Sequence, residues 1–373
     1  MFKTALKSQF GSKSWCVTLS TVVLAACGGG SGSDSGEGAT SASNSDQTSA
    51  VAVGEAGTKT LLASESVSTA ATDSSGWYFC SNEGQTCTFS GTRLVRFGAN
   101  SSYVYKSATN SIQCNSTTFG SDPAPGVAKT CSISNTPSPY GQDAAQYTLT
   151  FRDDFDGTAL NTSKWNDHIW YDPPSSTNDY GVSGGYLRIW PQADANGEYK
   201  ERILTTAGKF SQTYGYFEIE AKLPVGHGPW PAFWLLNSDN PDVGEPEIDI
   251  MEAYPGDNGG YWADSNNHPI RYGTSFYQNG NGANPPGLQG TQGNYTGDLS
   301  TGFHKYGLKW EASKLSFYFD GKLVYTANVS MSKKMYILLD MQYGSASGSV
   351  DSTTPLGPNN SFQINYARAW SFK

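Results

Sequence analysis

Charged residues and long apolar runs are both scarce in this chain of 373 residues. Asp, Glu, Lys and Arg make up 15% of it and hydrophobic residues 37%, which argues against coiled coils and long helices. After the first 26 residues, no stretch reaches the roughly 20 apolar residues that a membrane-spanning helix needs. Basic residues number 24 against 33 acidic ones. Nucleic acid is therefore not expected as a partner, because its phosphates require clustered Lys and Arg.

Turn-forming and aromatic residues are abundant instead. The chain holds 42 Gly and 18 Pro, and aromatics make up 13% of it. Short strand-like runs bounded by turn residues recur in the last part of the chain, which has no cysteine; examples are 214–221, 315–319, 322–325 and 336–339. Many strands without a long amphipathic helix predict an all-β sandwich over residues 148–373.

The N-terminus has the layout of a secretory signal. Three lysines precede an apolar run over 15–26, and small residues close it. The residues Leu24-Ala25-Ala26-Cys27 resemble the lipobox of bacterial lipoproteins, in which Cys27 would be lipidated; the alternative is an ordinary signal followed by a chance cysteine. Lipid chains on Cys27 would anchor the protein to a membrane. We therefore expect an exported protein, lipid-anchored to the bacterial cell envelope, and Gly28 after the cysteine favours the outer membrane.

Two further segments precede the large domain. Residues 27–75 are mostly Gly, Ser, Thr and Ala, a composition that cannot offset chain entropy by burial, so a disordered tether is expected. Residues 76–135 alternate apolar and polar positions between turn residues, which predicts a small β module. Its aromatic residues include Trp77 and Tyr105, which either stack on sugars or form its core and surface. Residues 136–147 form a second linker.

The cysteines of the module predict disulfides. An exported chain meets an oxidising compartment, and four cysteines lie in the module: Cys80, Cys87, Cys114 and Cys131. Three pairings are open, and we favour the local one, Cys80 with Cys87 and Cys114 with Cys131. Zinc is the competing explanation, but the module contains no histidine and the spacings are not those of zinc knuckles.

A carboxylate-rich segment is the main functional signal. The prolines Pro246 and Pro255 leave too little room for an ordinary helix, and the alternation after Pro246 has the period of a strand. Glu247 and Asp249 then share one face, whereas Glu252 would point to the other. A β-bulge at residue 250 or 251 would bring Glu252 back to the face of Glu247.

Three carboxylates on one face suggest glycoside chemistry. Double-displacement hydrolysis uses two carboxyl groups about 5 to 5.5 Å apart, one ionised and one protonated. Mutual repulsion favours that division, because at least one of the three groups should keep its proton near neutral pH. The competing explanation is a solvated acidic strand.

These residues resemble the Glu-x-Asp-x-x-Glu signature of glycoside hydrolase family 16. The resemblance extends over nearly all of 148–373, in blocks at 151–157, 160–165, 214–218, 223–224, 230–236, 303–310 and 317–321. It implies a concanavalin-like β-jelly-roll sandwich with a glycan cleft on its concave sheet. It also implies Glu247 as nucleophile, Glu252 as general acid/base and Asp249 as the residue that orients the nucleophile.

Substrate-binding residues are predicted around this segment. An exposed indole offers a flat apolar face to a sugar ring, so Trp230 is the favoured subsite residue, while Trp234 fits either a subsite or the core. The resemblance implies that Glu201 and Arg202 hydrogen-bond glycan hydroxyls. The Gly- and Asn-rich stretch 258–293 is expected to be a loop that shapes one wall of the cleft.

Two departures from the family pattern limit what it implies. Phe276 stands where many members have a histidine on the strand after the cluster, so glycan contacts near the acid/base are expected to differ. Asn365 stands where many members have an aspartate that binds a structural calcium. An asparagine offers a carbonyl oxygen without charge, which weakens such a site. We expect no cofactor and no catalytic metal; a structural calcium is the alternative left open.

The expected function is a retaining endo-β-glycanase that acts as a monomer on β-1,3- or mixed β-1,3/1,4-glucan or a related exopolysaccharide. One alternative is a lectin-like surface protein that keeps the fold without the chemistry. Another is a transglycosylase, which would pass through the same glycosyl-enzyme intermediate. Loops rather than the carboxylates set polymer specificity, so the motif does not choose among polysaccharides.

Overall fold

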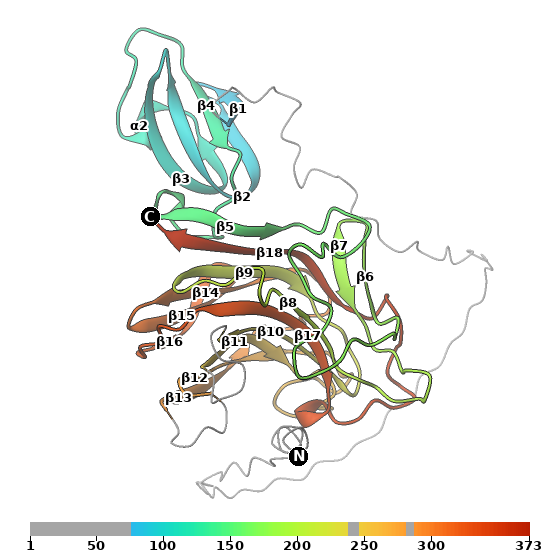
Figure 1. Cartoon of the computed structure of the whole chain (residues 1–373). Helices are drawn as coiled ribbons and strands as arrows, with labels where there is room; N and C mark the ends of the chain where they lie inside the picture. The colour runs from blue at the N-terminus through green and yellow to red at the C-terminus, as the bar shows by residue number, and fades with distance from the viewer. Residues whose placement is uncertain (1–75, 238–245, 281–286) are drawn as a thin grey trace, which may run out of the picture. The chain divides into compact units, whose positions relative to one another are not determined.

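The computed structural model describes residues 76–237, 246–280 and 287–373 (Figure 1), all within the unit Gly57–Lys373. The predicted signal at 1–26 and the tether at 27–75, with Cys27, lie outside the described residues. In the described ranges, no helix has both the length and the apolar character needed to cross a bilayer.

The first folded region is a four-stranded antiparallel sheet in the order β1-β4-β2-β3. Its elements are β1 (Trp77–Asn82), β2 (Thr86–Ala99), β3 (Ser102–Gln113), the short helix α2 (Ser116–Phe119) and β4 (Thr130–Ser134). Disulfides join Cys80 to Cys87 and Cys114 to Cys131, which confirms the favoured pairing. Since the module buries a small apolar core, each disulfide is expected to add about 2 to 4 kcal/mol to its stability.

The second region consists of two larger antiparallel sheets. The six-stranded sheet has the order β13-β12-β11-β10-β17-β8 and the eight-stranded sheet contains β16-β15-β14-β9-β18-β7-β6, with β5 paired to β18. The six-stranded sheet is formed by β8 (Arg202–Thr205), β10 (Pro229–Asn237), β11 (Glu247–Ala253), β12 (Arg271–Tyr277), β13 (Gln289–Tyr295) and β17 (Met335–Tyr343). The other sheet is formed by β5 (Tyr147–Asp153), β6 (Tyr180–Ser183), β7 (Tyr186–Ile189), β9 (Gly215–Lys222), β14 (His304–Glu311), β15 (Lys314–Phe319), β16 (Lys322–Ala327) and β18 (Phe362–Phe372).

Figure 1 shows the strands of these two sheets. One apolar core of buried side chains is formed by residues from both of them. Alternate residues of each strand point into it, such as Phe217 of β9 and Leu308 of β14 from one sheet, and Phe233 of β10 and Leu339 of β17 from the other. Each such side chain, fully buried, stabilises the fold by about 1.5 to 3 kcal/mol. The all-β sandwich predicted from the sequence is confirmed.

The opposite surface of the six-stranded sheet, which we call the outer face, carries the remaining alternate residues. A second apolar cluster covers part of it and includes Ile169, Ile203, Trp234 and Leu338. Ile169 lies in the irregular segment before β6, so that segment packs onto the β8/β17 side of this face. The side chains discussed below lie beside this cluster.

Two segments differ from their predicted description. The stretch 258–293, expected as a loop, contains all of β12 and the start of β13. The many Gly and Asn residues of this stretch favoured the loop prediction. The segment 136–147 contains a 3₁₀ turn (Ala144–Gln146) and is bonded to the eight-stranded sheet, because the Trp370 indole donates to the Pro137 carbonyl at 2.9 Å.

Candidate active site

Strand β11 carries a bulge at the position that matters for the carboxylates. Asp249 pairs with Ser275 of β12 and Glu252 pairs with Gly273, so β11 advances three residues while β12 advances two. The register with β10 shifts at the same place and leaves Ile250 without a partner. Cross-strand partners share a face, so Glu252 returns to the face of Asp249. The predicted bulge is confirmed.

The extra residue points into the core. Ile250 and Met251 are consecutive, yet both are buried among the apolar side chains between the sheets, with exposures of 1% and 0%. Their apolar character favours this arrangement over exposing either one on the outer face. Packing of the inner face therefore places Glu247, Asp249 and Glu252 together on the outer face.

Burial and mutual repulsion dominate the protonation of these three groups. Burial raises the pKa of Glu247, and the nearby charge of Glu252 raises it further, whereas a hydrogen bond with Asp249 acts to lower it. Burial raises the pKa of Asp249 well above its usual range, and the same hydrogen bond raises it further. Both effects of that bond have one cause: Asp249 holds the proton and donates it towards the Glu247 carboxylate.

Glu252 is held by two aromatic side chains. Its Oε1 accepts hydrogen bonds from Trp230 Nε1 at 3.1 Å and from the Tyr254 hydroxyl at 3.2 Å. Burial raises the pKa of Glu252, while these two bonds act to lower it. The rings of Trp230 and Tyr254 lie 5.3 Å apart by their centroids. Glu252 is thus fixed in orientation and keeps a proton more readily than an exposed glutamate.

A fourth carboxyl group on this face was not predicted from the sequence. Asp340 of β17 pairs with Ala232 of β10, and Ala232 pairs with Glu252, so the two acids are two strands apart on the outer face. Asp340 is 0% exposed, and its pKa is raised well above the usual range by burial and then by Glu201. An aspartate that interrupts the apolar run of β17 was the available signal.

Among the predicted subsite residues, the two tryptophans occupy different environments. Trp230 is partly exposed and lies against Glu252. Trp234 is 9% exposed and packs with Ile203 and Leu338 in the cluster on the outer face. Trp230 therefore offers more surface to a sugar than Trp234, which mainly supports the β8/β17 side of the site.

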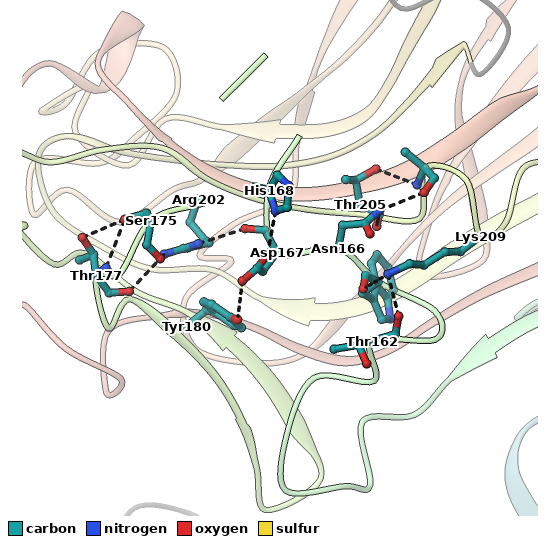
Figure 2. Close-up of polar contacts among 12 residues, drawn as sticks. Thr162, Asn166, Asp167, His168, Ser175, Thr177, Tyr180, Arg202, Thr205 and Lys209 are labelled. Atoms are coloured by element: carbon teal, nitrogen blue, oxygen red, sulfur yellow. Dashed lines mark hydrogen bonds and ion pairs between the residues drawn. The ribbon is translucent and has the colours of Figure 1, made fainter. Parts of the chain in front are cut away.

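Arg202 lies in the interior rather than at the sugar-binding surface. It is 2% exposed, and its Nε donates to Asp179 at 2.6 Å. Its terminal nitrogens donate to the backbone carbonyls of Asp167, Ser175 and Thr177, as Figure 2 shows. These contacts occupy the donors of Arg202, which anchors the segment before β6. The prediction that Arg202 hydrogen-bonds glycan hydroxyls is therefore wrong. Its neighbour Glu201 instead lies against Asp340.

The expectation about Phe276 is corrected as well. Phe276 is 6% exposed, belongs to the core between the sheets and pairs with Ile248, so it does not face the site. The residue on the outer face at this level is Tyr277, which pairs with Glu247. Side chains alternate along β12, so Phe276 faces the core and Tyr277 faces the outer side. The resemblance to the family pattern had implied that Phe276 lies near the acid/base.

The Asn365 region does not fit a divalent cation well. The Asn365 amide donates to Glu220, and Lys305 Nζ lies 2.6 Å from the same carboxylate. A lysine that neutralises Glu220 competes with a cation for it. In the described part of the chain, no group of three or more His, Cys, Asp or Glu residues is placed to hold a metal ion.

Comparisons with known proteins agree with this geometry. The family model for the beta-porphyranase A–D GH16 domain matches residues 146–372. Endo-1,3-1,4-beta-glycanase EglC of Rhizobium meliloti (strain 1021) is 29% identical over 264 residues, 61% of this chain and 53% of that protein. Endo-1,3-1,4-beta-glycanase ExsH of the same organism is 31% identical over 221 residues, 56% of this chain and 43% of that protein. The chain spans about half the length of these relatives.

A solved structure supports the same assignment. The endo-beta-1,3-glucanase from Pyrococcus furiosus is similar with a TM-score of 0.50 at 26% identity, covering 61% of this chain and 95% of that one. Since the family model spans more than half of the sequence, the chain belongs to glycoside hydrolase family 16.

Proposed function

We propose that this protein is a retaining endo-β-glycanase in which Glu247 is the nucleophile and Glu252 the general acid/base. The observation that carries the proposal is the β11 bulge, which gathers Glu247, Asp249 and Glu252 on one face. Burial raises the pKa of both glutamates, and the support for separate roles is their different partners: Asp249 bonds Glu247 and acts to lower its pKa, whereas Glu252 is held by Trp230 and Tyr254.

In the first step, a Glu247 carboxylate oxygen attacks the anomeric carbon of the bound sugar. The glycosidic bond breaks with its electron pair on the leaving oxygen, and Glu252 donates its proton to that oxygen. A covalent glycosyl-enzyme and a shortened glycan result. The protonated Asp249 keeps its hydrogen bond on Glu247 and holds the attacking oxygen in place.

In the second step, Glu252 is ionised and removes a proton from water. The water oxygen attacks the anomeric carbon, the bond to Glu247 breaks, and the sugar leaves with its original configuration. Burial serves both steps, because a raised pKa lets Glu252 give and take a proton near neutral pH. If a glycan hydroxyl takes the place of water, transglycosylation follows.

The proposed substrate is a β-1,3-glucan, a mixed β-1,3/1,4-glucan or a related exopolysaccharide. The support is the similarity to proteins named endo-1,3-1,4-beta-glycanase and endo-beta-1,3-glucanase. A panel of pure polysaccharides, with products separated by size, tests this choice. Random internal cleavage supports an endo-acting enzyme, whereas single sugars released from one end contradict it.

The catalytic roles are tested with variants of each glutamate. E247Q and E252Q are expected to lose hydrolysis by about a thousandfold or more while the fold stays intact, which circular dichroism checks. Azide should restore turnover in Glu247→Ala and Glu252→Ala with opposite anomeric configurations of the sugar azide, because it replaces the nucleophile in one and attacks the intermediate in the other. The matched control is E311Q on the eight-stranded sheet, which should retain full activity.

The outcomes separate the competing functions. Binding of glucan without any release of reducing ends in the unmodified protein would support the lectin-like alternative. Products longer than the substrate would identify transglycosylation. Full hydrolysis by E247Q or E252Q would overturn the proposed roles.

We also propose that lipid on Cys27 anchors the protein to the cell envelope. The support is the signal-like run that ends in Leu24-Ala25-Ala26-Cys27. Expression with radiolabelled palmitate should label the unmodified protein and not C27A, and C27A should leave the membrane fraction. Equal labelling of both proteins contradicts the anchor.

A further inference from the structure

The edge of the six-stranded sheet beyond Glu252 carries an arginine on the outer face. Arg271 begins β12 and lies directly opposite Tyr295 of β13. The next residue, Tyr272, is buried between the sheets, so Arg271 points to the opposite side, as Gly273 does. Gly273 pairs with Glu252. Arg271 therefore lies one strand away from the proposed acid/base and two residues along.

Aromatic rings connect Glu252 with this arginine. Starting from Trp230, which is bonded to Glu252, the ring centroids of Trp230 and Tyr254 are 5.3 Å apart, those of Tyr254 and Trp262 are 5.1 Å apart, and those of Trp262 and Tyr261 are 4.9 Å apart. The Arg271 guanidinium lies 4.5 Å from the centroid of the last ring. This series of ring contacts runs from Glu252 to the edge of the sheet.

Two glycines lie beside these rings, and Gly293 is the one that the close approach of Tyr261 requires. Gly273 and Gly293 are cross-strand partners on β12 and β13. A Cβ at Gly293 would lie 2.5 Å from the hydroxyl oxygen of Tyr261, and one at Gly273 would lie 3.5 Å from the Trp262 ring. A side chain at Gly293 would displace Tyr261. The rings thus lie close to the backbone of β12 and β13 at these positions.

The hydrogen-bond donors of Arg271 are available. Its guanidinium lies between Tyr261, 53% exposed, and Tyr295, 66% exposed, at 4.5 and 4.8 Å from their centroids. Across the described ranges, its side chain forms no hydrogen bond and no ion pair; Arg202, by contrast, is engaged by Asp179 and three carbonyls. Ring stacking fixes the plane of a guanidinium and leaves its edge free for an anion.

We propose that Arg271, with Tyr261 and Tyr295, is a subsite for a sugar residue that carries an anionic substituent, either a carboxylate or a sulfate ester. The inference rests on the proposed function, because it assumes that the glycan runs across the outer face from Glu252. A planar guanidinium suits both anions, which it binds through paired N–H donors.

The test compares matched substrates and variants. One mixed-linkage β-glucan is used in three forms: unmodified, partly oxidised to carboxylates at C6, and partly sulfated. R271M should lower the ratio of kcat/KM on an anionic form to kcat/KM on the neutral form about tenfold. R271K should give an intermediate ratio, because lysine keeps the positive charge but lacks the paired N–H donors of the guanidinium. A fall on the oxidised form alone identifies a carboxylate, and a fall on the sulfated form alone identifies a sulfate ester.

A binding measurement separates this inference from the proposed function. Affinity electrophoresis in gels containing each polysaccharide compares E247Q with the double variant E247Q/R271M, so that no hydrolysis is needed. The control is R188M, because Arg188 also stacks on a tyrosine, Tyr186, but lies on the eight-stranded sheet. The double variant should lose retardation on the anionic gels, and R188M should not. Equal loss on neutral and anionic gels, or no loss at all, would overturn the proposal, whereas failure of the unmodified protein to hydrolyse would overturn only the proposed function.

Discussion

The two faces of the six-stranded sheet are formed by the same strands but bury different kinds of side chain. The inner face is apolar and packs against the other sheet, with residues such as Phe233 and Leu339 fully buried. The outer face buries acids, with Asp249 at 5% and Asp340 at 0% exposure. Adjacent residues of β17 therefore have opposite effects on stability. Burial of Leu339 stabilises the fold, whereas burial of Asp340 destabilises it unless Asp340 is protonated. Stability is concentrated on one face and chemistry on the other.

Deleting Ile250 together with Met251 should have the largest effect, because Glu252 would then follow Glu247 by three residues. Regular alternation over this odd separation would turn Glu252 away from Glu247, and hydrolysis should fall by about a thousandfold or more. Rates of reducing-end release measure this. I250V keeps the chain length and should lose about 0.5 to 1.5 kcal/mol of stability with little change in rate. A folded variant that lacks both Ile250 and Met251 and keeps normal activity would contradict the role of strand parity in placing Glu252.

L339A tests the inner face. Removing this buried side chain should lower the free energy of unfolding by about 2 to 5 kcal/mol. Urea denaturation followed by tryptophan fluorescence measures the loss. Activity per folded molecule should remain close to normal at temperatures well below the transition, since no group of the outer face is altered.

D340N tests the neighbouring residue on the outer face. An amide has a similar shape and no ionised form, so this variant should be more stable than the unmodified protein at pH 8. The same urea titration, run beside L339A, gives the sign directly. Destabilisation at pH 8 would show that Asp340 is not an unfavourable buried acid.

The pH dependence of stability follows from the same groups. The native pKa values of Glu247, Asp249, Glu252 and Asp340 are raised, so the native state holds protons that the unfolded chain has released. Stability should therefore fall as pH rises from about 4.5, the unfolded range, through the native values. D340N should make that decline shallower without abolishing it, because Glu218 on the other sheet, with a pKa raised to about 7, contributes as well. Melting temperatures between pH 4.5 and 8.5 measure both slopes.

Y254F should give the smallest effect. The Tyr254 hydroxyl bonds Glu252 and acts to lower its pKa, so removing it should move the alkaline limb of the kcat/KM profile upward by less than about one pH unit. The matched control is Y318F, because Tyr318 lies on β15 of the eight-stranded sheet. A downward shift in Y254F would contradict the assigned direction.

Much of the site could be predicted, but not all of it. The even spacing of Glu247 and Asp249 and the need for a bulge before Glu252 were visible as strand parity. Asp340 was not, because it joins the site through strand pairing with β10, far away in the sequence. Arg202 and Phe276 were misplaced because residue type alone does not reveal which face of its strand a side chain occupies.

The sequence by itself determined the class of fold and the segment that carries the carboxylates, since alternation and proline boundaries are local properties, and it favoured the disulfide pairing that the structure then established. Only the tertiary structure decided which residues share the outer face. That depends on strand register across the sheet and on which side chains the core between the sheets accepts. Those long-range contacts brought Asp340 beside Glu201, buried Arg202 and left Arg271 facing outward beyond Glu252.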